Sequence, residues 1–476
     1  MSPTIRLALG ALIAAGATTA VLAQAPASPD LVKHVDEVFS AFTAEGPGCA
    51  VAVYQNGSVS LAKAYGSANL EYGIPITPTT PFIVGSVSKQ FTAAAILLLV
   101  EEKRLSLSDD VRKYVPELKD YGTPITIDHL IHHTSGLRDW WELVGAAGLR
   151  YDDTYAVQDV LDMTTRQHGL NFKPGDRYVY SNTGYIVLGI VVQRVTGKSL
   201  REFAAERIFG PLKMSDSHYQ DDHTRPVRGR AYAYSPTADG RYAINVWNND
   251  LVGQGGVMTT VLDLAKWDAN FDSGSVGGPG FLKRQLEQGT LNSGTRLHYA
   301  FGVSVDTYRG LDLIEHSGST GGYRAVLTRF PKQRTSVAVL CNVSIAAPVS
   351  LGHRVADYVL RDSFTAPAPP ADTNAAAGEN GERATAVVDV AVAALGRFPG
   401  RYYSEELDAF YEISLSGSAL SLKRPRAKPE NLTARDAATF ASTAGRLRFT
   451  MGPDGRAERF VLDGGLVQNL VFVRRR

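Results

Sequence analysis

Gly85-Ser86-Val87-Ser88-Lys89 stands directly before the apolar run 91–100, so this stretch is expected to open a helix. Residues three apart in a helix share one face, which should place the Ser86 hydroxyl beside the Lys89 amine. A serine hydroxyl is a poor nucleophile until a nearby base activates it, and such an amine is within reach. On its own the pattern is weak, because an N-capping serine with a solvated lysine usually accounts for it.

A second motif, Tyr180-Ser181-Asn182, follows the turn Lys173-Pro174-Gly175-Asp176 and precedes a helical stretch that begins near Thr183. A tyrosine on such a loop can carry a proton, and an asparagine can orient a substrate amide. An ordinary loop tyrosine followed by a capping asparagine is the structural alternative.

A third motif, His316-Ser317-Gly318-Ser319-Thr320-Gly321-Gly322, lies between two strand-like runs, 311–316 and 323–330. Its glycines would let a substrate backbone lie against the strand edge. Taken alone, it could be only a glycine-rich hairpin.

The three motifs, in this order, resemble those of the serine β-lactamase and penicillin-binding protein superfamily. The class C β-lactamase-like branch is the most similar, and it also contains D-Ala-D-Ala carboxypeptidases, D-aminopeptidases and esterases. The resemblance runs from about residue 30 to 360. It includes the landmarks Pro81-Phe82-Ile83-Val84-Gly85, His133-Thr134-Ser135-Gly136-Leu137 and Gly253-Gln254-Gly255-Gly256.

The resemblance implies a role for each matching residue. Ser86 matches the acylated nucleophile, Lys89 the amine that eases its deprotonation, and Tyr180 the phenol that relays a proton to the leaving group. The expected substrate-binding residues are Asn182, His316, Ser317 and Gly318. The backbone N–H groups of Ser86 and Ser319 match an oxyanion hole, where losing one donor typically costs about 10²–10³-fold in rate.

Lys89 is expected to be partly desolvated beside Tyr180, which would favour a phenolate or a neutral amine over the charge states found in water. The sequence leaves open which of the two takes the proton of the serine.

His316 stands where the third motif carries lysine or histidine. A lysine is a fixed cation that can hold a substrate carboxylate, whereas histidine, with an ordinary pKa of about 6.5, is mostly neutral at pH 7. A β-lactam must be bound through its carboxylate and then hydrolysed quickly off the serine. The histidine therefore weakens the β-lactamase interpretation and is more similar to the peptidases and esterases of the family.

Composition excludes several other classes of protein. The 476 residues are 44% hydrophobic and 20% charged, with 49 basic and 48 acidic residues, so a nucleic-acid partner is not expected. Adjacent histidines, His132 and His133, point apart on one element and lack an acidic partner at ligand spacing, so no metal site is predicted. Neither a metal nor an organic cofactor is required by the expected chemistry.

Four segments are predicted along the chain. Residues 1–23 have the basic start, short apolar run and small-residue end of a signal peptide, so export to a periplasm or the outside is expected, without a membrane anchor. Residues 24–362 form the hydrolase domain, 363–385 a Pro- and Ala-rich linker, and 386–476 a small domain of short alternating runs.

The predicted fold class is α+β. Strand-like runs at both ends of the large domain predict one antiparallel sheet flanked by helices, and the resemblance adds an all-helical subdomain. The small domain is predicted to be an antiparallel β-barrel, similar to the lipocalin-like domains of some family members. Such a barrel either restricts access to the active site or only stabilises the protein.

Cys49 and Cys341 each lie in an apolar, strand-like run. Export would allow a disulfide between them, but two buried free thiols are the favoured interpretation.

Together these features predict an exported serine hydrolase that acylates Ser86 and passes the acyl group to water or an amine. The expected substrate is a small molecule or peptide with a D-residue near the scissile bond, peptidoglycan-derived peptides among them, cleaved in the carboxypeptidase or aminopeptidase manner. A β-lactamase and a carboxylesterase of the same fold remain alternatives within the enzyme class. A catalytically silent binding or sensing module is the alternative from another class, and the oligomeric state stays open.

Overall fold

The computed structural model describes residues 27–368 and 392–475. The predicted signal peptide 1–23, and most of the predicted linker 363–385, lie outside the described residues. Within the described residues, no helix is both long and apolar enough to span a lipid bilayer.

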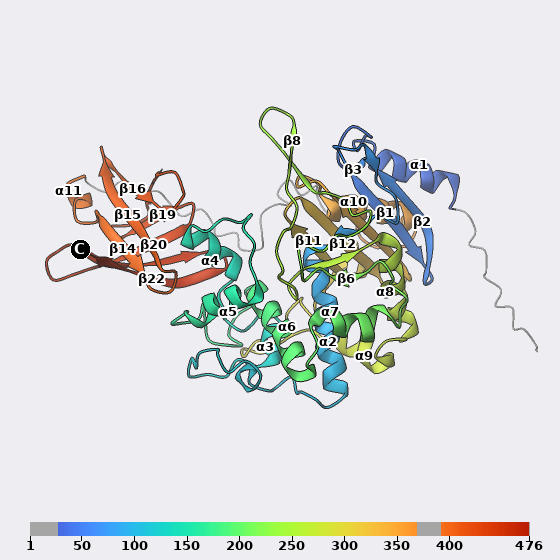
Figure 1. Cartoon of the computed structure of the whole chain (residues 1–476), viewed down its shortest axis with the longest axis horizontal. Coiled ribbons are helices and arrows are strands. Elements are labelled where there is room, and N and C mark those ends of the chain that lie inside the picture. Colours follow the sequence, from blue (N-terminus) through green and yellow to red (C-terminus); the bar gives the residue numbers. More distant parts are fainter. Residues whose placement is uncertain (1–26, 369–391, 476) are drawn as a thin grey trace, which may run out of the picture.

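One antiparallel sheet of six strands forms the centre of the large domain, in the order β10-β11-β12-β13-β1-β2 (Figure 1). Its strands are β1 Cys49–Gln55, β2 Ser58–Tyr65, β10 Ser304–Tyr308, β11 Leu311–Thr320, β12 Tyr323–Phe330 and β13 Thr335–Cys341. The pairing of β1 with β13 confirms that both ends of the domain build one sheet. β11 continues four residues beyond the predicted strand, so residues 316–320 of the third motif lie within it, and Gly321 and Gly322 form the turn that follows.

The two faces of the sheet are covered by different helices. Successive side chains of a strand point to opposite faces, and because β1 is apolar at nearly every position, both faces need a cover. Val51 and Val53 pack with α1 and α10 on one face, while Ala52 and Tyr54 belong to the larger core on the other. The helices are α1 Pro29–Val38, α2 Lys89–Glu101, α3 Ile127–Ile131, α4 Trp140–Ala147, α5 Val157–Thr165, α6 Asn182–Thr196, α7 Leu200–Ala204, α8 Val261–Ser273, α9 Gly278–Gln285, α10 Pro348–Val359 and α11 Val392–Leu395.

Helices α2 and α6 pack against each other beside the sheet, and both begin at predicted motifs (Figure 1). A short 3₁₀ turn, η1 Gly85–Ser88, leads into α2. Ser181 caps α6, its hydroxyl accepting the N–H of Gly184 at 3.3 Å, and Gly197 ends the helix with φ of +74°. Two other short helical segments are η2 Val111–Lys113, which is a 3₁₀ helix, and η3 Ala205–Phe209, which is a π-helix.

Short strands connect these helices. They are β3 Ser67–Asn69, β4 Ile74–Pro75, β5 Phe82–Ile83, β6 His218–Tyr219, β7 Tyr234–Pro236, β8 Tyr242–Ile244 and β9 Val257–Thr259. The pair β5–β9 lies next to the start of η1, because the N–H of Val84 bonds to the carbonyl of Val257 at 3.0 Å.

The C-terminal part is a nearly closed antiparallel barrel in the order β17-β16-β15-β14-β22-β21-β20-β19-β18. Its strands are β14 Gly400–Ser404, β15 Ala409–Ser416, β16 Ala419–Lys423, β17 Glu430–Asn431, β18 Thr433–Ala434, β19 Thr439–Ser442, β20 Gly445–Met451, β21 Ala457–Gly464 and β22 Val467–Arg475. Alternate side chains point inward, and buried aromatic rings such as Phe449, Phe460 and Phe472 fill the interior. The predicted barrel is confirmed.

The barrel docks on the end of the large domain that carries α4 and α5 (Figure 1). Arg138 forms an ion pair with Glu406 of the barrel, and both side chains are almost completely buried. Arg138 also donates to the carbonyls of Gln468 and Asn469, each at 2.8 Å. Since a buried arginine needs its donors satisfied, these contacts tie the barrel firmly to the segment that precedes α4.

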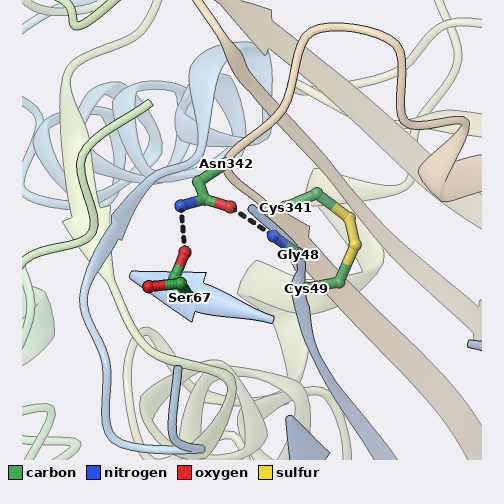
Figure 2. Close-up of a disulfide and its surroundings, with 5 residues drawn as sticks. All are labelled: Gly48, Cys49, Ser67, Cys341 and Asn342. Carbon is green, nitrogen blue, oxygen red and sulfur yellow. Dashed lines mark hydrogen bonds between the residues drawn. A yellow bond between two sulfur atoms is a disulfide. The ribbon is translucent and has the colours of Figure 1, made fainter. Parts of the chain in front are cut away.

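The expectation of two free thiols is wrong, because Cys49 and Cys341 form a disulfide with an S–S distance of 2.07 Å (Figure 2). The two cysteines are directly opposite on β1 and β13. Beside the disulfide, the amide of Asn342 accepts the N–H of Gly48 at 2.7 Å and donates to the carbonyl of Ser67 at 2.9 Å. The pairing depends on the register of two strands far apart in sequence, which the sequence alone does not reveal.

Candidate active site

Ser86 and Lys89 are neighbours at the junction of η1 and α2, as the spacing predicts. The Lys89 amine donates to the Ser86 hydroxyl at 3.0 Å, to the side-chain oxygen of Asn182 at 2.9 Å and to the carbonyl of Gln254 at 2.7 Å. Ser86 alone among residues 81–90 is not buried, whereas the Lys89 side chain is fully enclosed. The nucleophile candidate is therefore accessible while its amine is shielded from water.

The burial of Lys89 changes its protonation. Desolvation lowers the pKa of Lys89 to about 7, and the nearby carboxylate of Asp139 opposes this shift. Half of the amines are then neutral at pH 7, and a neutral amine has the lone pair needed to accept a proton.

Asp139 is the residue of this site that the sequence analysis missed. Its carboxylate accepts the backbone N–H of Asn182 at 2.6 Å and that of Trp141 at 3.0 Å, and burial raises its pKa. The sequence signal was an aspartate before the apolar helix α4, which predicts an N-cap and nothing more. In the structure this cap also fixes the start of α6, where Asn182 lies.

Tyr180 lies against both members of the Ser–Lys pair. The Lys89 nitrogen is 4.7 Å from the centre of the Tyr180 ring, and the Ser86 side chain is close enough to the tyrosine hydroxyl to oppose part of the rise in its pKa. Desolvation raises the pKa of Tyr180 well above its ordinary value, so the phenol is neutral at physiological pH. Of the two charge states that the sequence left open, this environment favours the neutral amine over the phenolate.

His316 is held by hydrogen bonds at both ring nitrogens. Nδ1 lies 2.6 Å from the carbonyl of Ser317, and Nε2 lies 2.9 Å from the hydroxyl of Tyr299. Because a carbonyl only accepts, Nδ1 carries the proton and Nε2 accepts from the tyrosine. Burial lowers the pKa of His316 to about 3, so the ring is neutral.

The backbone N–H groups of Ser86 and Ser319 come together where η1 meets β11. A Cβ atom on Gly85 would lie 2.7 Å from the nitrogen of Ser319, and one on Gly318 would lie 2.0 Å from the carbonyl oxygen of Val84. Gly85 also has φ of +51°. Only glycine permits this close approach of two backbones, which accounts for Gly85 in the first motif and Gly318 in the third.

Beyond Glu315, β11 lacks a partner on its β10 side within the described part of the chain. β10 pairs with Leu311 through Glu315, whereas β12 pairs on the other side as far as Thr320. The segment 316–320 therefore has a strand edge that no other strand covers and that an extended peptide could join, although the Ser317 carbonyl is already bonded to His316.

A cavity of about 380 Å³ opens beside Ser86. Asn182 and Ser319 also line it, but His316, Ser317 and Gly318 do not. Four aromatic side chains line one part of it, Trp140, Trp141, Tyr151 and Trp247, and the amides of Asn245, Asn248 and Gln254 line another. Among the described residues that line it, none is lysine or arginine, and the one charged side chain is Asp152.

Known proteins resemble the chain in sequence. The family model described as Beta-lactamase matches residues 35–359. D-aminopeptidase from Gluconobacter oxydans (strain 621H) is 29% identical over 305 residues, covering 64% of this chain and 57% of that protein. D-aminopeptidase from Brucella canis is 30% identical over 298 residues, covering 63% and 57%. The chain thus matches little more than half the length of these curated relatives.

Solved structures share the fold. The penicillin-binding protein homologue from Pyrococcus abyssi, described as octameric, superposes with a TM-score of 0.62 at 24% identity, covering 94% of this chain and 98% of that one. D-amino acid amidase from Ochrobactrum anthropi SV3 gives a TM-score of 0.57 at 20% identity, covering 70% and 99%. At such identities the likeness concerns the fold alone.

Proposed function

The chain belongs to the beta-lactamase family, and from this premise we propose that it is an exported serine hydrolase that cleaves amide bonds next to a D-residue through an acyl-enzyme on Ser86. The observation that carries the proposal is the Lys89 amine, buried, 3.0 Å from the Ser86 hydroxyl and with its pKa lowered to about 7. Such a pair activates a serine at neutral pH without a histidine.

In the proposed acylation, the neutral Lys89 amine takes the Ser86 proton while the oxygen attacks the substrate carbonyl. The oxyanion that forms is stabilised by the backbone N–H groups of Ser86 and Ser319. Tyr180 then gives its hydroxyl proton to the leaving nitrogen, and the proton that Lys89 took from Ser86 replaces it on the phenol. The C–N bond breaks and the amine leaves. In deacylation a water molecule attacks the acyl carbonyl and gives a proton to the neutral Lys89 amine, the C–O bond to Ser86 breaks, and that proton returns to the serine oxygen as the acid is released.

The cavity supports an aminopeptidase or amidase rather than an enzyme that binds a carboxylate beside the scissile bond. His316 is neutral, and the described lining residues contribute no lysine or arginine. The buried Lys89 amine already bonds to Ser86, Asn182 and Gln254, so a β-lactam or a C-terminal carboxylate would find no free cation in the cavity, which disfavours the β-lactamase alternative. Aromatic walls such as Trp140 and Trp247 suit a bulky apolar side chain on the D-residue.

The D-configuration and the export of the protein are supported by different observations. Relatives named D-aminopeptidase match most of the large domain, which favours a D-residue in the cavity. The disulfide between Cys49 and Cys341 favours an oxidising compartment, because disulfides persist there and are rare in cytosolic proteins. Both the periplasm and the cell exterior meet this condition.

The test compares hydrolysis of the p-nitroanilides of D-Phe and L-Phe by the wild type and by Ser86→Ala. We expect D-Phe to be preferred at least tenfold in kcat/KM and the activity to vanish in the variant. Preference for the L-substrate, or activity that survives in Ser86→Ala, would contradict the proposal. Turnover of short acyl esters without any D-anilide would favour the carboxylesterase of the same fold.

Intact-protein mass spectrometry of the protein mixed with a penicillin distinguishes the proposed amidase from a β-lactamase and from a carboxypeptidase. We expect no lasting adduct, since the cavity lacks a cation for the penicillin carboxylate. Rapid penicillin turnover would instead identify a β-lactamase. A persistent adduct on the Ser86 peptide would confirm the nucleophile and favour a carboxypeptidase.

A further inference from the structure

A second, larger cavity lies between the large domain and the barrel. Its volume is about 930 Å³, and it is lined on one side by α4 and the segment after it, and on the other by barrel residues that include Arg424 and Arg426. Trp141, Tyr151 and Asp152 line both this interdomain groove and the cavity beside Ser86. The groove therefore continues the proposed active-site cavity toward the barrel.

Two glycine contacts hold the walls of the interdomain groove together. Gly148 ends α4 with φ of +72°, and a Cβ atom on it would lie 2.4 Å from the Cβ of Pro425. A Cβ on Gly465 would lie 2.7 Å from the carboxylate of Glu142. Backbone and side chains are in contact at both points, so the groove is a built feature of the docked barrel.

The charges of the groove differ from those of the active-site cavity. Arg424 pairs with Glu430 at 3.1 Å, and Arg150 pairs with Asp152. Arg426 is exposed and makes no hydrogen bond or ion pair with the described residues. An arginine presents a planar fork of donors that matches a carboxylate, and Arg426 has this fork free.

We propose that this interdomain groove is a subsite that binds the carboxylate at the far end of an extended peptide, with Arg426 as its main contact. The inference rests on the proposed function. If the D-residue with its free amino group occupies the cavity beside Ser86, the leaving peptide is the part that extends toward the groove. An arginine in the groove, with no lysine or arginine lining the cavity beside Ser86, would favour longer peptides over dipeptides and β-lactams.

The test uses the full chain and peptides made of D-Phe followed by one to four glycines, each as the free acid and as the C-terminal amide. We expect kcat/KM for the acid to exceed that for the amide about five- to tenfold once the peptide reaches the groove. Arg426→Ala should remove this preference, and Arg426→Glu should reverse it. The preference should also shrink at high salt, because Arg426 is exposed.

Arg459→Ala is the matched control, since Arg459 is an exposed arginine of the barrel outside the groove. It should keep the full preference for the acid. Equal rates for acid and amide at every length, or a preference that survives in Arg426→Glu, would overturn the inference while the proposed function stands.

A binding measurement separates failure of the subsite from failure of the proposed function. Ser86→Ala is titrated with the four-glycine acid and amide, and tryptophan fluorescence is followed, because Trp141 lines both cavities. If the wild type cleaves none of the peptides, the proposed function fails. Tighter binding of the acid that depends on Arg426 would still support the subsite, and equal binding of acid and amide would refute it.

Discussion

In the proposed mechanism, Lys89 sets the pH at which Ser86 can be acylated. With a pKa of about 7 instead of the ordinary 10.5, the amine is neutral about a thousand times more often at pH 7. Its neutral fraction should rise about tenfold between pH 6 and pH 8. Because only the neutral amine can accept the serine proton, the acylation rate should rise by the same factor and level off above pH 8.

Asp139→Asn tests the cause of this pH dependence. The Asp139 carboxylate favours the charged form of Lys89, so its removal should lower the pKa of the amine further. The midpoint of the acylation profile should therefore move to lower pH. Asp162→Asn, which neutralises an exposed carboxylate on α5, should leave the midpoint unchanged.

The assay is stopped-flow measurement of the p-nitrophenol burst from a D-Phe p-nitrophenyl ester between pH 5.5 and 9. The rate of Ser86→Ala is subtracted at each pH as background. A profile that is flat across this range, or that still rises steeply at pH 9 without levelling off, would refute the role given to Lys89. A midpoint that moves upward in Asp139→Asn would refute the electrostatic argument.

Three further predictions concern stability and protonation. Replacing Cys49 and Cys341 together by Ala should lower the free energy of unfolding by about 2–4 kcal/mol in urea titrations, and unchanged stability would contradict a disulfide in the folded protein. Glu406→Ala should cost about 3 kcal/mol in the same measurement, because it leaves the buried Arg138 charge without its partner; a loss below about 1 kcal/mol would show that the pair is dispensable. His316 should show no titration between pH 5 and 8 in NMR spectra, assigned by comparison with His316→Gln, since burial lowers its pKa to about 3.

The parts of the site that depend on local spacing could be predicted from the sequence. Ser86 and Lys89 meet because a helix brings residues three apart onto one face. Tyr180 and Asn182 were assigned through the family resemblance, and the structure brings both to the same amine. The alternating patterns of the last ninety residues were enough to predict a barrel.

The parts that depend on tertiary contact could not be predicted. Asp139 looked like an ordinary N-cap, and its closeness to Lys89 arises only when α4 packs beside α6. The disulfide required the register of β1 against β13. The interdomain groove depends on how the barrel docks, which no single stretch of sequence encodes.

The disulfide between β1 and β13, the first and the last strand of the six-stranded sheet along the chain, also makes the large domain a covalent ring. Residues Cys49 and Cys341 are 292 positions apart, so the loop between them contains Ser86 and every other proposed catalytic residue. A protease that cuts once inside this loop, for example in the hairpin that joins β7 and β8, would leave both fragments attached to one another. Outside a cell, where proteases are common and repair is absent, a single nick need not separate Lys89 from the strand that carries Ser319.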